Sequence, residues 1–319
     1  MKTLVFLEHH EGALQKGSLG VLSKAAQLGG EVAAVVIGSG VKELAPGAGA
    51  FGAQTVYAAD DPRLEAPLPQ PRVDVLASLV RAHGFENVLF AQSVLAADVA
   101  AGLAARLEAG LNWDLSGLAE RDGQLVGTRA ALADSVIVEV AWKGTPRLAI
   151  VRTGTFDPVE TGGSAQVEDA PVELEEHSMR ATMVEQAHAE QTGPSIEDAD
   201  TIVAGGRGLG SPENFSLAEG LAGALGGAVA ATRAVVDAGW YPYSAQVGQT
   251  GKTVSPKLYV ALGISGAIQH KVGMQGSSTI VAINKDANAP IFEFSDLGVV
   301  GDVHEVVPKL TELIRQKKA

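Results

Sequence analysis

The segment that decides the fold runs from Gln246 to His270 and reads QVGQTGKTVSPKLYVALGISGAIQH. A Gly-rich polar loop comes first. The apolar strand KLYVALGI follows at Lys257–Ile264, and a Gly/Ser turn then leads into a helix that should begin near Gly266. A strand that ends in such a turn at a helix N-terminus is suited to phosphate groups, because backbone N–H groups point outward there. With Arg233 just upstream, the segment predicts an α/β domain that holds a phosphorylated cofactor.

Strands and helices alternate on both sides of this segment, from about Ile196 to the C-terminus. Buried strands are expected at 201–206, 228–233, 257–264, 278–286 and 290–296. Ser211 and Pro212 suit the start of the first helix and Gly226–Gly227 its end, and a last helix is expected from Val303 to Arg315. Five such strands joined by crossover helices form a doubly wound parallel sheet, whose ligands bind at the carboxyl ends of the strands.

The N-terminal part shows the same alternation and then changes. Strands are expected at 4–8, 31–38, 54–59 and 87–91, and helices at 15–28, 41–48, 72–83 and 96–107. This pattern predicts a mostly parallel α/β domain with helices on both faces of the sheet. Between 123 and 152, three apolar runs are separated by turns at 133–134 and 143–144. These runs predict antiparallel hairpins added to the parallel core.

A weakly periodic segment joins the two parts. Residues 157–194 are rich in acidic and small polar side chains, and only VEDAPVELEEHS, at 167–178, is suited to one exposed strand. The stretch EQTGPS, at 190–195, has the composition of a linker. We therefore expect an N-terminal domain at 1–192 and a ligand-binding domain at 193–319.

Length, charge and composition limit the function. The chain of 319 residues can build two domains, each with its own core. Its net charge of −13 argues against nucleic acid as a partner. Because there is no cysteine, disulfides, iron–sulfur clusters and thiol catalysis are ruled out. No apolar run reaches the roughly 20 residues of a membrane-spanning helix, and a strand is expected at Thr3–Glu8 rather than a targeting peptide. We expect a cytoplasmic protein without direct membrane insertion.

Several polar residues follow the expected strands of the C-terminal domain: Arg207, Thr232, Arg233, Ser265, Asn284 and Asp302. Most have an ordinary structural interpretation. Ser265 suits a helix N-cap, Asn284 a turn, and Asp302 with Glu305 a capping box. A histidine early in a helix, such as His270, is more often a surface residue than a functional one. Arg233 is different because it ends an apolar strand, where a charge needs water or a partner, and only Asp237 is near in sequence. Together these residues converge on one sheet edge, which favours binding.

Other chemistries lack support in the sequence. There is no HExxH, no Walker loop and no GxSxG elbow. The string GQTGKT, at 248–253, lacks the Walker spacing and precedes its strand instead of following it. His9 and His10, between Glu8 and Glu11, do not form a convincing ligand set, so we expect no metal site.

The C-terminal block resembles the α subunit of electron transfer flavoprotein. The resemblance rests on GGRGLGSPENF (205–215), TRAVVDAGW (232–240), the segment 246–270, STIVAINKDANAPIF (278–292) and the helix after Gly301–Asp302. It implies one FAD per heterodimer, held mainly by this domain, and a β subunit partner that usually carries AMP. It also implies acyl-CoA and related dehydrogenases as electron donors, as in fatty acid β-oxidation, and a quinone-linked membrane oxidoreductase as acceptor. Such a protein is an electron carrier and not an enzyme with its own organic substrate.

The resemblance also implies FAD contacts at matching positions. Arg207 corresponds to an arginine near the pyrophosphate, Thr232 to a hydroxyl that is often serine, and Arg233 to an arginine set against the isoalloxazine ring. The loop beside the ring comprises Val247, Gly248, Gln249 and Thr250, with the Thr250 hydroxyl near N5, and Gln246 just before it is also expected to bind the cofactor. The segment that wraps the ribityl and phosphate groups comprises Ser265, Gly266, Ala267, Ile268, Gln269 and His270, with His270 facing the C2 carbonyl. Asn284 and Asp302 match the AMP half. Arg233, Thr250 and His270 would tune the flavin. Lys271 and Val272, where relatives often have apolar residues, receive no role.

Two alternatives stay open from the sequence. One is a nucleotide-binding module without flavin, which uses the same Gly-rich turns for an adenylate. The other is a flavoenzyme with its own organic substrate, although no general acid–base pair is evident beside the loop. An absorbance scan separates the first alternative from an electron carrier, and turnover of a small substrate without a partner protein identifies the second.

Overall fold

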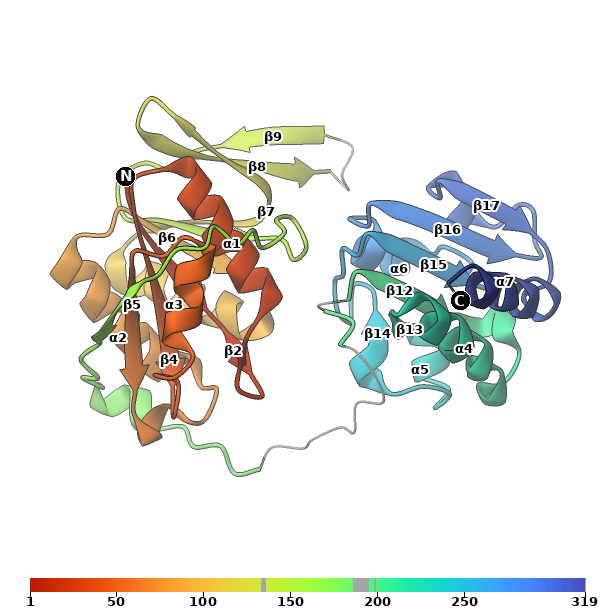
Figure 1. Cartoon of the computed structure of the whole chain (residues 1–319), viewed down its shortest axis with the longest axis horizontal. Coiled ribbons are helices and arrows are strands. Elements are labelled where there is room, and N and C mark those ends of the chain that lie inside the picture. Colours follow the sequence, from red (N-terminus) through yellow and green to blue (C-terminus); the bar gives the residue numbers. More distant parts are fainter. Residues whose placement is uncertain (133–135, 186–194, 198, 319) are drawn as a thin grey trace. The chain divides into compact units, whose positions relative to one another are not determined.

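The computed structural model describes residues 1–132, 136–185, 195–197 and 199–318. They divide into two compact units, one ending at Gln186 and the other beginning at Ala187 (Figure 1). The boundary predicted between residues 192 and 193 lies outside the described residues. Each unit has a sheet and hydrophobic cores of its own. No helix in the described ranges is long and apolar enough to cross a bilayer.

The N-terminal unit is built on a nine-stranded sheet with the order β11-β5-β4-β1-β6-β10-β7-β8-β9. Its strands are β1 (Lys2–Leu7), β4 (Glu31–Gly38), β5 (Thr55–Asp60), β6 (Asn87–Ala91), β7 (Gly110–Arg121), β8 (Gln124–Ala131), β9 (Val136–Val140), β10 (Arg147–Val151) and β11 (Gln166–Asp169). The pairs β7–β8 and β8–β9 are antiparallel and the other pairs of this sheet are parallel. A small hairpin, β2 (His9–His10) with β3 (Ala13–Leu14), follows β1. The expectation of a mostly parallel sheet with an antiparallel addition is confirmed.

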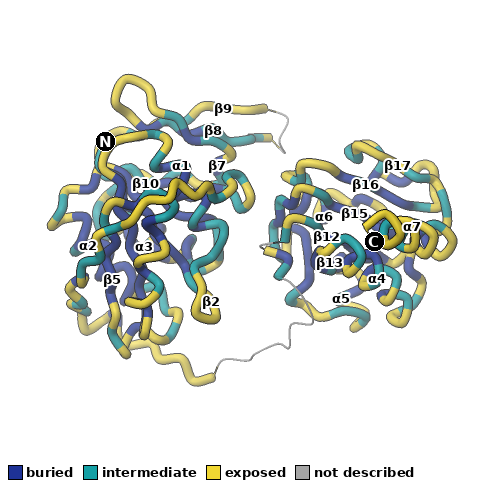
Figure 2. Tube along the Cα trace, in the orientation of Figure 1, coloured by how far each residue is buried: buried dark blue, intermediate teal, exposed yellow. Residues whose placement is uncertain are grey.

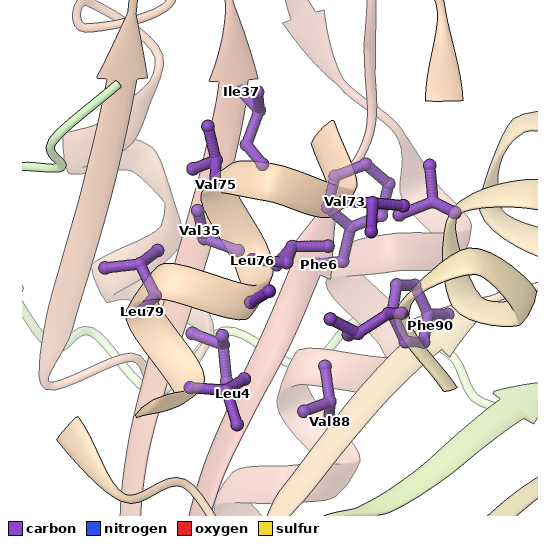
Figure 3. Close-up of a cluster of buried hydrophobic side chains, with 14 of the residues drawn as sticks. Leu4, Phe6, Val35, Ile37, Val73, Val75, Leu76, Leu79, Val88 and Phe90 are labelled. Atoms are coloured by element: carbon purple, nitrogen blue, oxygen red, sulfur yellow. The ribbon is translucent and has the colours of Figure 1, made fainter. Parts of the chain in front are cut away.

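Helices cover both faces of this sheet because its central strands are apolar on both sides. In β1, Leu4 and Phe6 point to the face covered by α2 (Pro69–His83) and α3 (Val94–Leu107). Val5 and Leu7 point to the opposite face, which is covered by α1 (Lys16–Leu28) and the 3₁₀ helix η1 (Ala45–Phe51). Figure 3 shows the first core, with side chains of α2 packed against those of β1, β4 and β6.

Three sequence-based expectations for this unit need correction. The run at 147–154 was expected in an antiparallel hairpin, but β10 is parallel to both of its neighbours, β6 and β7. The long strand β7 was not expected. The helix expected at 41–48 is instead the 3₁₀ helix η1, where Pro46 and two glycines disfavour an α-helix. The turn expected at 133–134 lies outside the described residues. The exposed strand expected within 167–178 exists as the edge strand β11.

The C-terminal unit is a six-stranded, fully parallel sheet with the order β14-β13-β12-β15-β16-β17. Its strands are β12 (Thr201–Gly205), β13 (Ala228–Thr232), β14 (Gln246–Val247), β15 (Leu258–Leu262), β16 (Thr279–Asn284) and β17 (Leu297–Val300). Its helices are α4 (Phe215–Leu225), α5 (Arg233–Val236), α6 (Ile268–Met274) and α7 (Val303–Lys318). In chain order the strands run 3-2-1-4-5-6, so the direction of winding reverses between β12 and β15, and the predicted doubly wound sheet is confirmed.

Two layers cover this sheet. Helices α4, α5 and α7 pack on one face through residues such as Phe215, Val235 and Val307. On the other face, α6 and the 3₁₀ helix η7 (Pro290–Glu293) pack against β15 through Met274, Ile291 and the buried ring of Tyr259. Figure 2 shows the central strands of each unit as buried, whereas edge strands such as β9 are more exposed.

Some predicted boundaries in this unit were wrong. The fifth strand, expected at 290–296, is β17 at Leu297–Val300, and the residues before it form η7, which begins at Pro290. The two-residue strand β14 was not expected. Helix α6 begins at Ile268 rather than near Gly266, since Gly266 adopts φ +88°. A 3₁₀ turn, η5 (Pro212–Asn214), separates Ser211 from α4. The Gly226 stop of α4 and the last helix from Val303 are confirmed.

Candidate functional site

The predicted site residues all lie at the carboxyl edge of the C-terminal sheet or in the segments that leave it. Arg207 follows β12, Thr232 ends β13, and the loop at 248–250 follows β14. On the other side of the winding reversal, 265–270 follow β15, Asn284 ends β16 and Asp302 follows β17. Six parallel strands about 4.8 Å apart give an edge about 24 Å long. This length suits an extended dinucleotide better than a mononucleotide.

Glycines bring the two central loops of this edge into backbone contact. Gly208 N–H donates to the Gly263 carbonyl over 2.9 Å. A Cβ on Gly208 would lie 2.6 Å from Gly263 Cα, and Gly263 itself adopts φ +60°. Gly206, with its N–H on the Leu262 carbonyl, is equally crowded by Gly263. Because these crowded positions are glycines, they place no side chain in the crevice between β12 and β15, where a doubly wound sheet binds its ligand.

The loop after β14 is held in one shape by its own hydrogen bonds. The buried Gln246 amide donates to the Thr250 carbonyl over 3.0 Å and to the Thr250 hydroxyl over 3.2 Å. Lys252 N–H donates to the Gln246 carbonyl and Gly248 N–H to the Lys252 carbonyl. Tyr243, whose phenol donates to the Thr250 carbonyl over 2.9 Å, adds a contact from outside the loop. The exposed side chains of Gln249 and Thr250 are therefore carried on a fixed backbone.

This loop is attached to helix α6. Gln249 N–H donates to the Gln269 carbonyl over 2.7 Å, and Val254 N–H donates to the Gly273 carbonyl over 2.8 Å. Gly273 permits the approach, because a Cβ there would lie 2.3 Å from Gly248 N. The loop and the N-terminal turn of α6, with its exposed Ile268 and Gln269, thus form one piece of surface.

His270 lies under this surface and is buried, so the expectation of a surface histidine is wrong. Its Nδ1 is 3.0 Å from the Val247 carbonyl oxygen and its Nε2 is 3.0 Å from the Tyr259 hydroxyl. A carbonyl only accepts, so Nδ1 must carry the proton, and Nε2 must accept from Tyr259. The ring is then neutral, with both nitrogens used by the protein. The role implied by the resemblance, a contact to the flavin C2 carbonyl, would require one of these contacts to be given up or shared.

The burial of His270 makes the stability of the C-terminal unit depend on pH. Burial lowers the pKa of His270 from 6.5 to about 4, although the hydrogen bond to Val247 opposes this. Between these values the unfolded chain binds a proton that the folded chain does not, so the free energy of unfolding falls as the pH drops. We expect His270 to account for a loss of about 1.4 kcal/mol between about pH 7.5 and pH 5.5. Urea unfolding of the wild type and His270→Gln at both pH values measures it; equal losses in the two proteins would contradict the assignment.

The two arginines of the edge are exposed and differ in their contacts. Arg207 begins the 3₁₀ helix η4 (Arg207–Leu209) beside the glycine contacts. Arg233 begins α5, its side chain is 64% exposed, and its Nε donates to the Asp237 carboxylate over 3.1 Å. The Arg233–Asp237 pair is the one that the sequence suggested. Thr232, just before it, is buried at the strand end. Both guanidinium groups are therefore accessible to an anionic ligand.

The residues on the other half of the edge have structural roles as well. Asn284 donates to the Ile264 carbonyl over 2.9 Å and accepts from Asp286 N–H over 3.0 Å, which joins the loops after β15 and β16. Asp302 accepts from His304 N–H over 2.8 Å as the N-cap of α7, so its capping role is confirmed, although no described hydrogen bond of the Glu305 side chain completes the capping box. Ser265, by contrast, is exposed and does not cap α6, whose N-cap is Ala267. Its side chain is available for a ligand.

Asp302→Ala separates the capping role of Asp302 from ligand binding. Loss of the cap should lower the free energy of unfolding by about 1 kcal/mol, which thermal melting will show. If Asp302 also contacts the adenosine half of FAD, retention of FAD during dialysis should fall as well. Normal retention with a lower melting temperature would leave Asp302 as a cap alone.

Two contributors to this site were not predicted from the sequence. Gly263 and Tyr259 were seen only as parts of the apolar strand 257–264, although the LGISG string signals a strained turn. Within the described residues, no group of three or more His, Asp or Glu side chains is arranged to hold a metal ion. The site offers exposed cations, hydroxyls and glycine-lined backbone, which fit the phosphates and the polar ring edge of a flavin dinucleotide.

Comparisons with known proteins agree with this geometry. The family described as Electron transfer flavoprotein domain matches residues 3–175, and the Electron transfer flavoprotein FAD-binding domain matches residues 195–275. The electron transfer flavoprotein subunit alpha of Mycobacterium tuberculosis is 45% identical over 319 residues, covering 99% of each chain. That of Mycobacterium leprae is 43% identical with 99% of each chain covered, and that of Thermoanaerobacterium thermosaccharolyticum 38% identical with 98% covered. On these matches, which span both units, the chain belongs to the electron transfer flavoprotein α subunit family.

Proposed function

We propose that the C-terminal edge described above holds FAD in a heterodimer with a β subunit, and that this heterodimer carries electrons between other proteins. The single observation that carries the proposal is the placement of the cations, hydroxyls and glycine turns on one edge about 24 Å long. Membership of a flavoprotein family whose matched domain is described as FAD-binding supports it. Bound FAD would supply the redox chemistry. The described edge offers no acid–base pair for an organic substrate, which favours an electron carrier over a flavoenzyme with its own substrate.

The resemblance to the family assigns the residues to parts of the cofactor, and the strand order keeps the proposed ring and AMP contacts at opposite ends of the edge. Arg207, at the central crevice, would neutralise the pyrophosphate. Arg233, Thr232 and the Val247–Thr250 loop, at the β13–β14 end, would face the isoalloxazine ring. Ser265–Gln269 would contact the ribityl and phosphate groups, and Asn284 and Asp302, at the β16–β17 end, the AMP half. His270 would tune the flavin from its buried position beneath the Val247–Thr250 loop.

The partners belong to the same proposal. The β subunit would carry AMP, acyl-CoA or related dehydrogenases would donate electrons, and a quinone-linked membrane oxidoreductase would accept them. The family membership supports the heterodimer itself most strongly. A cytoplasmic location is also proposed, and cell fractionation tests it.

Anaerobic reduction tests the electron-carrier function. The heterodimer, mixed with a catalytic amount of an acyl-CoA dehydrogenase and its acyl-CoA, should lose its flavin absorbance, whereas acyl-CoA alone should leave the absorbance unchanged. Bleaching by acyl-CoA alone would instead indicate a flavoenzyme with its own substrate. A colourless heterodimer that binds adenylates would indicate a nucleotide-binding module.

A further inference from the structure

The buried phenol of Tyr259 has a single described polar contact, and that contact leads to the proposed FAD loop. Tyr259 lies in β15 with its side chain fully buried among apolar residues that include Ile264 and Met274. A buried tyrosine hydroxyl needs a partner, and here the partner is His270 Nε2 at 3.0 Å. Burial also raises the pKa of Tyr259 far above its usual value of 10.0, so the hydroxyl keeps its proton and acts as a donor.

The contact continues through the imidazole ring to the loop. His270 Nδ1 is 3.0 Å from the carbonyl of Val247, the residue before Gly248. The Val247 carbonyl can only accept and a neutral imidazole has one N–H, so the direction is fixed: Tyr259 donates to His270, and His270 donates to Val247. The series connects the centre of the sheet to the first residue of the loop without any charged group.

We propose that Tyr259 is a positioning residue of the FAD site, which holds the Val247–Thr250 loop against helix α6 through the ring of His270. The inference rests on the proposed function, because the position of this loop matters for the cofactor only if FAD binds beside it. The series adds a side-chain anchor at the base of the loop to the backbone contacts that Gln249 and, beyond the loop, Val254 make to α6.

The strand position of Tyr259 explains why it suits this task. It pairs with Ile202 of β12 and Ile280 of β16, so its backbone is fixed on both sides. A rigid donor at the centre of the sheet fixes both the ring orientation and the tautomer of His270. Without the hydroxyl, Nε2 would be a buried acceptor with no described partner, and the ring would be free to turn away from Val247.

Tyr259→Phe, made in the α subunit of the heterodimer, tests the inference. Protection of the Gln249 and Gly248 amides against hydrogen exchange should fall about tenfold, whereas the amides of β12 should keep their protection. Retention of FAD should weaken about fivefold, as expected for one lost buried hydrogen bond. Tyr241→Phe is the matched control: it removes the hydroxyl of a half-buried tyrosine that stacks on Phe215 and lies 3.5 Å from Glu219, in the same unit and with no described hydrogen bond to the loop.

A spectroscopic measurement on the wild type keeps the inference testable even if the variant folds poorly. Histidine-selective ¹⁵N NMR, with His270→Gln to assign the signal, should show His270 protonated at Nδ1 and unprotonated at Nε2 near neutral pH. Protonation at Nε2, or Gln249 exchange that changes no more in Tyr259→Phe than in Tyr241→Phe, would overturn the proposal. Equal loss of protection in the loop and in β12 would also overturn it, because the role would then be general stability. If the wild type retains no FAD, the proposed function fails, while the exchange and NMR results still decide the role of Tyr259.

Discussion

Replacing Arg233 with alanine should lower the first reduction potential of the bound flavin by about 50 to 170 mV. One-electron reduction adds negative charge to the ring, and a guanidinium within about 4 Å stabilises it by about 1 kcal/mol in a water-like medium and about 4 kcal/mol at an effective dielectric of 20. The 64% exposure of the Arg233 side chain and its pairing with Asp237 favour the lower half of this range. An anaerobic dithionite titration with an indicator dye measures the potential.

Two companion variants separate charge from packing in this experiment. Arg233→Lys keeps the cation and should change the potential much less than Arg233→Ala. Asp237→Asn removes the carboxylate 3.1 Å from Arg233 Nε and should raise the potential, because the guanidinium is then less compensated. A potential that does not move in Arg233→Ala would show that this arginine does not face the ring.

Replacing Gly266 with alanine should abolish FAD loading and lower the free energy of unfolding of the C-terminal unit by about 3 kcal/mol. Gly266 adopts φ +88°, and a Cβ would lie 2.3 Å from the backbone N of Ile291. Ile291 N–H donates to the Ser265 carbonyl over 2.9 Å, so the substitution pushes apart the turn that presents Ser265. Thermal melting and the flavin content of the purified protein measure the two effects.

Gly223→Ala is the matched control for Gly266→Ala. Gly223 is an exposed residue of α4, and a Cβ there would meet nothing within 4 Å. Because alanine favours a helix, this change should preserve FAD loading and stabilise the unit by up to about 1 kcal/mol. Wild-type stability and FAD content in Gly266→Ala would contradict the close approach seen between the loops at 265–266 and 290–291.

The strands that the sequence predicts best are those with unbroken apolar runs. Glu31–Gly38 and Asn87–Ala91 were predicted with the bounds that the structure shows, because strands buried on both faces contain little else. Strand β7 was missed because it alternates irregularly, is partly exposed and contains Asp114 at φ +59°. The two residues of β14 are too short for any periodicity, and their pairing with β13 depends on the fold.

The features of the candidate site also divide into those that the sequence suggested and those that depend on the fold. Residues such as Arg233, Asn284 and Asp302 were proposed as site residues because each stands at or just past the end of a strand, and parallel strands end at a common edge. The surroundings of His270 were not predictable, because its two partners, Tyr259 and Val247, are 11 and 23 residues away in sequence. Nor does local sequence show that Gly208 and Gly263 touch, since that contact is made by two loops that only the sheet brings together.

The flavin content of the wild-type heterodimer tests the central claim most directly. The α chain, co-expressed with its β subunit, should yield a yellow complex that releases one FAD per heterodimer on acid treatment. A colourless complex that takes up no FAD when the cofactor is added would contradict the account.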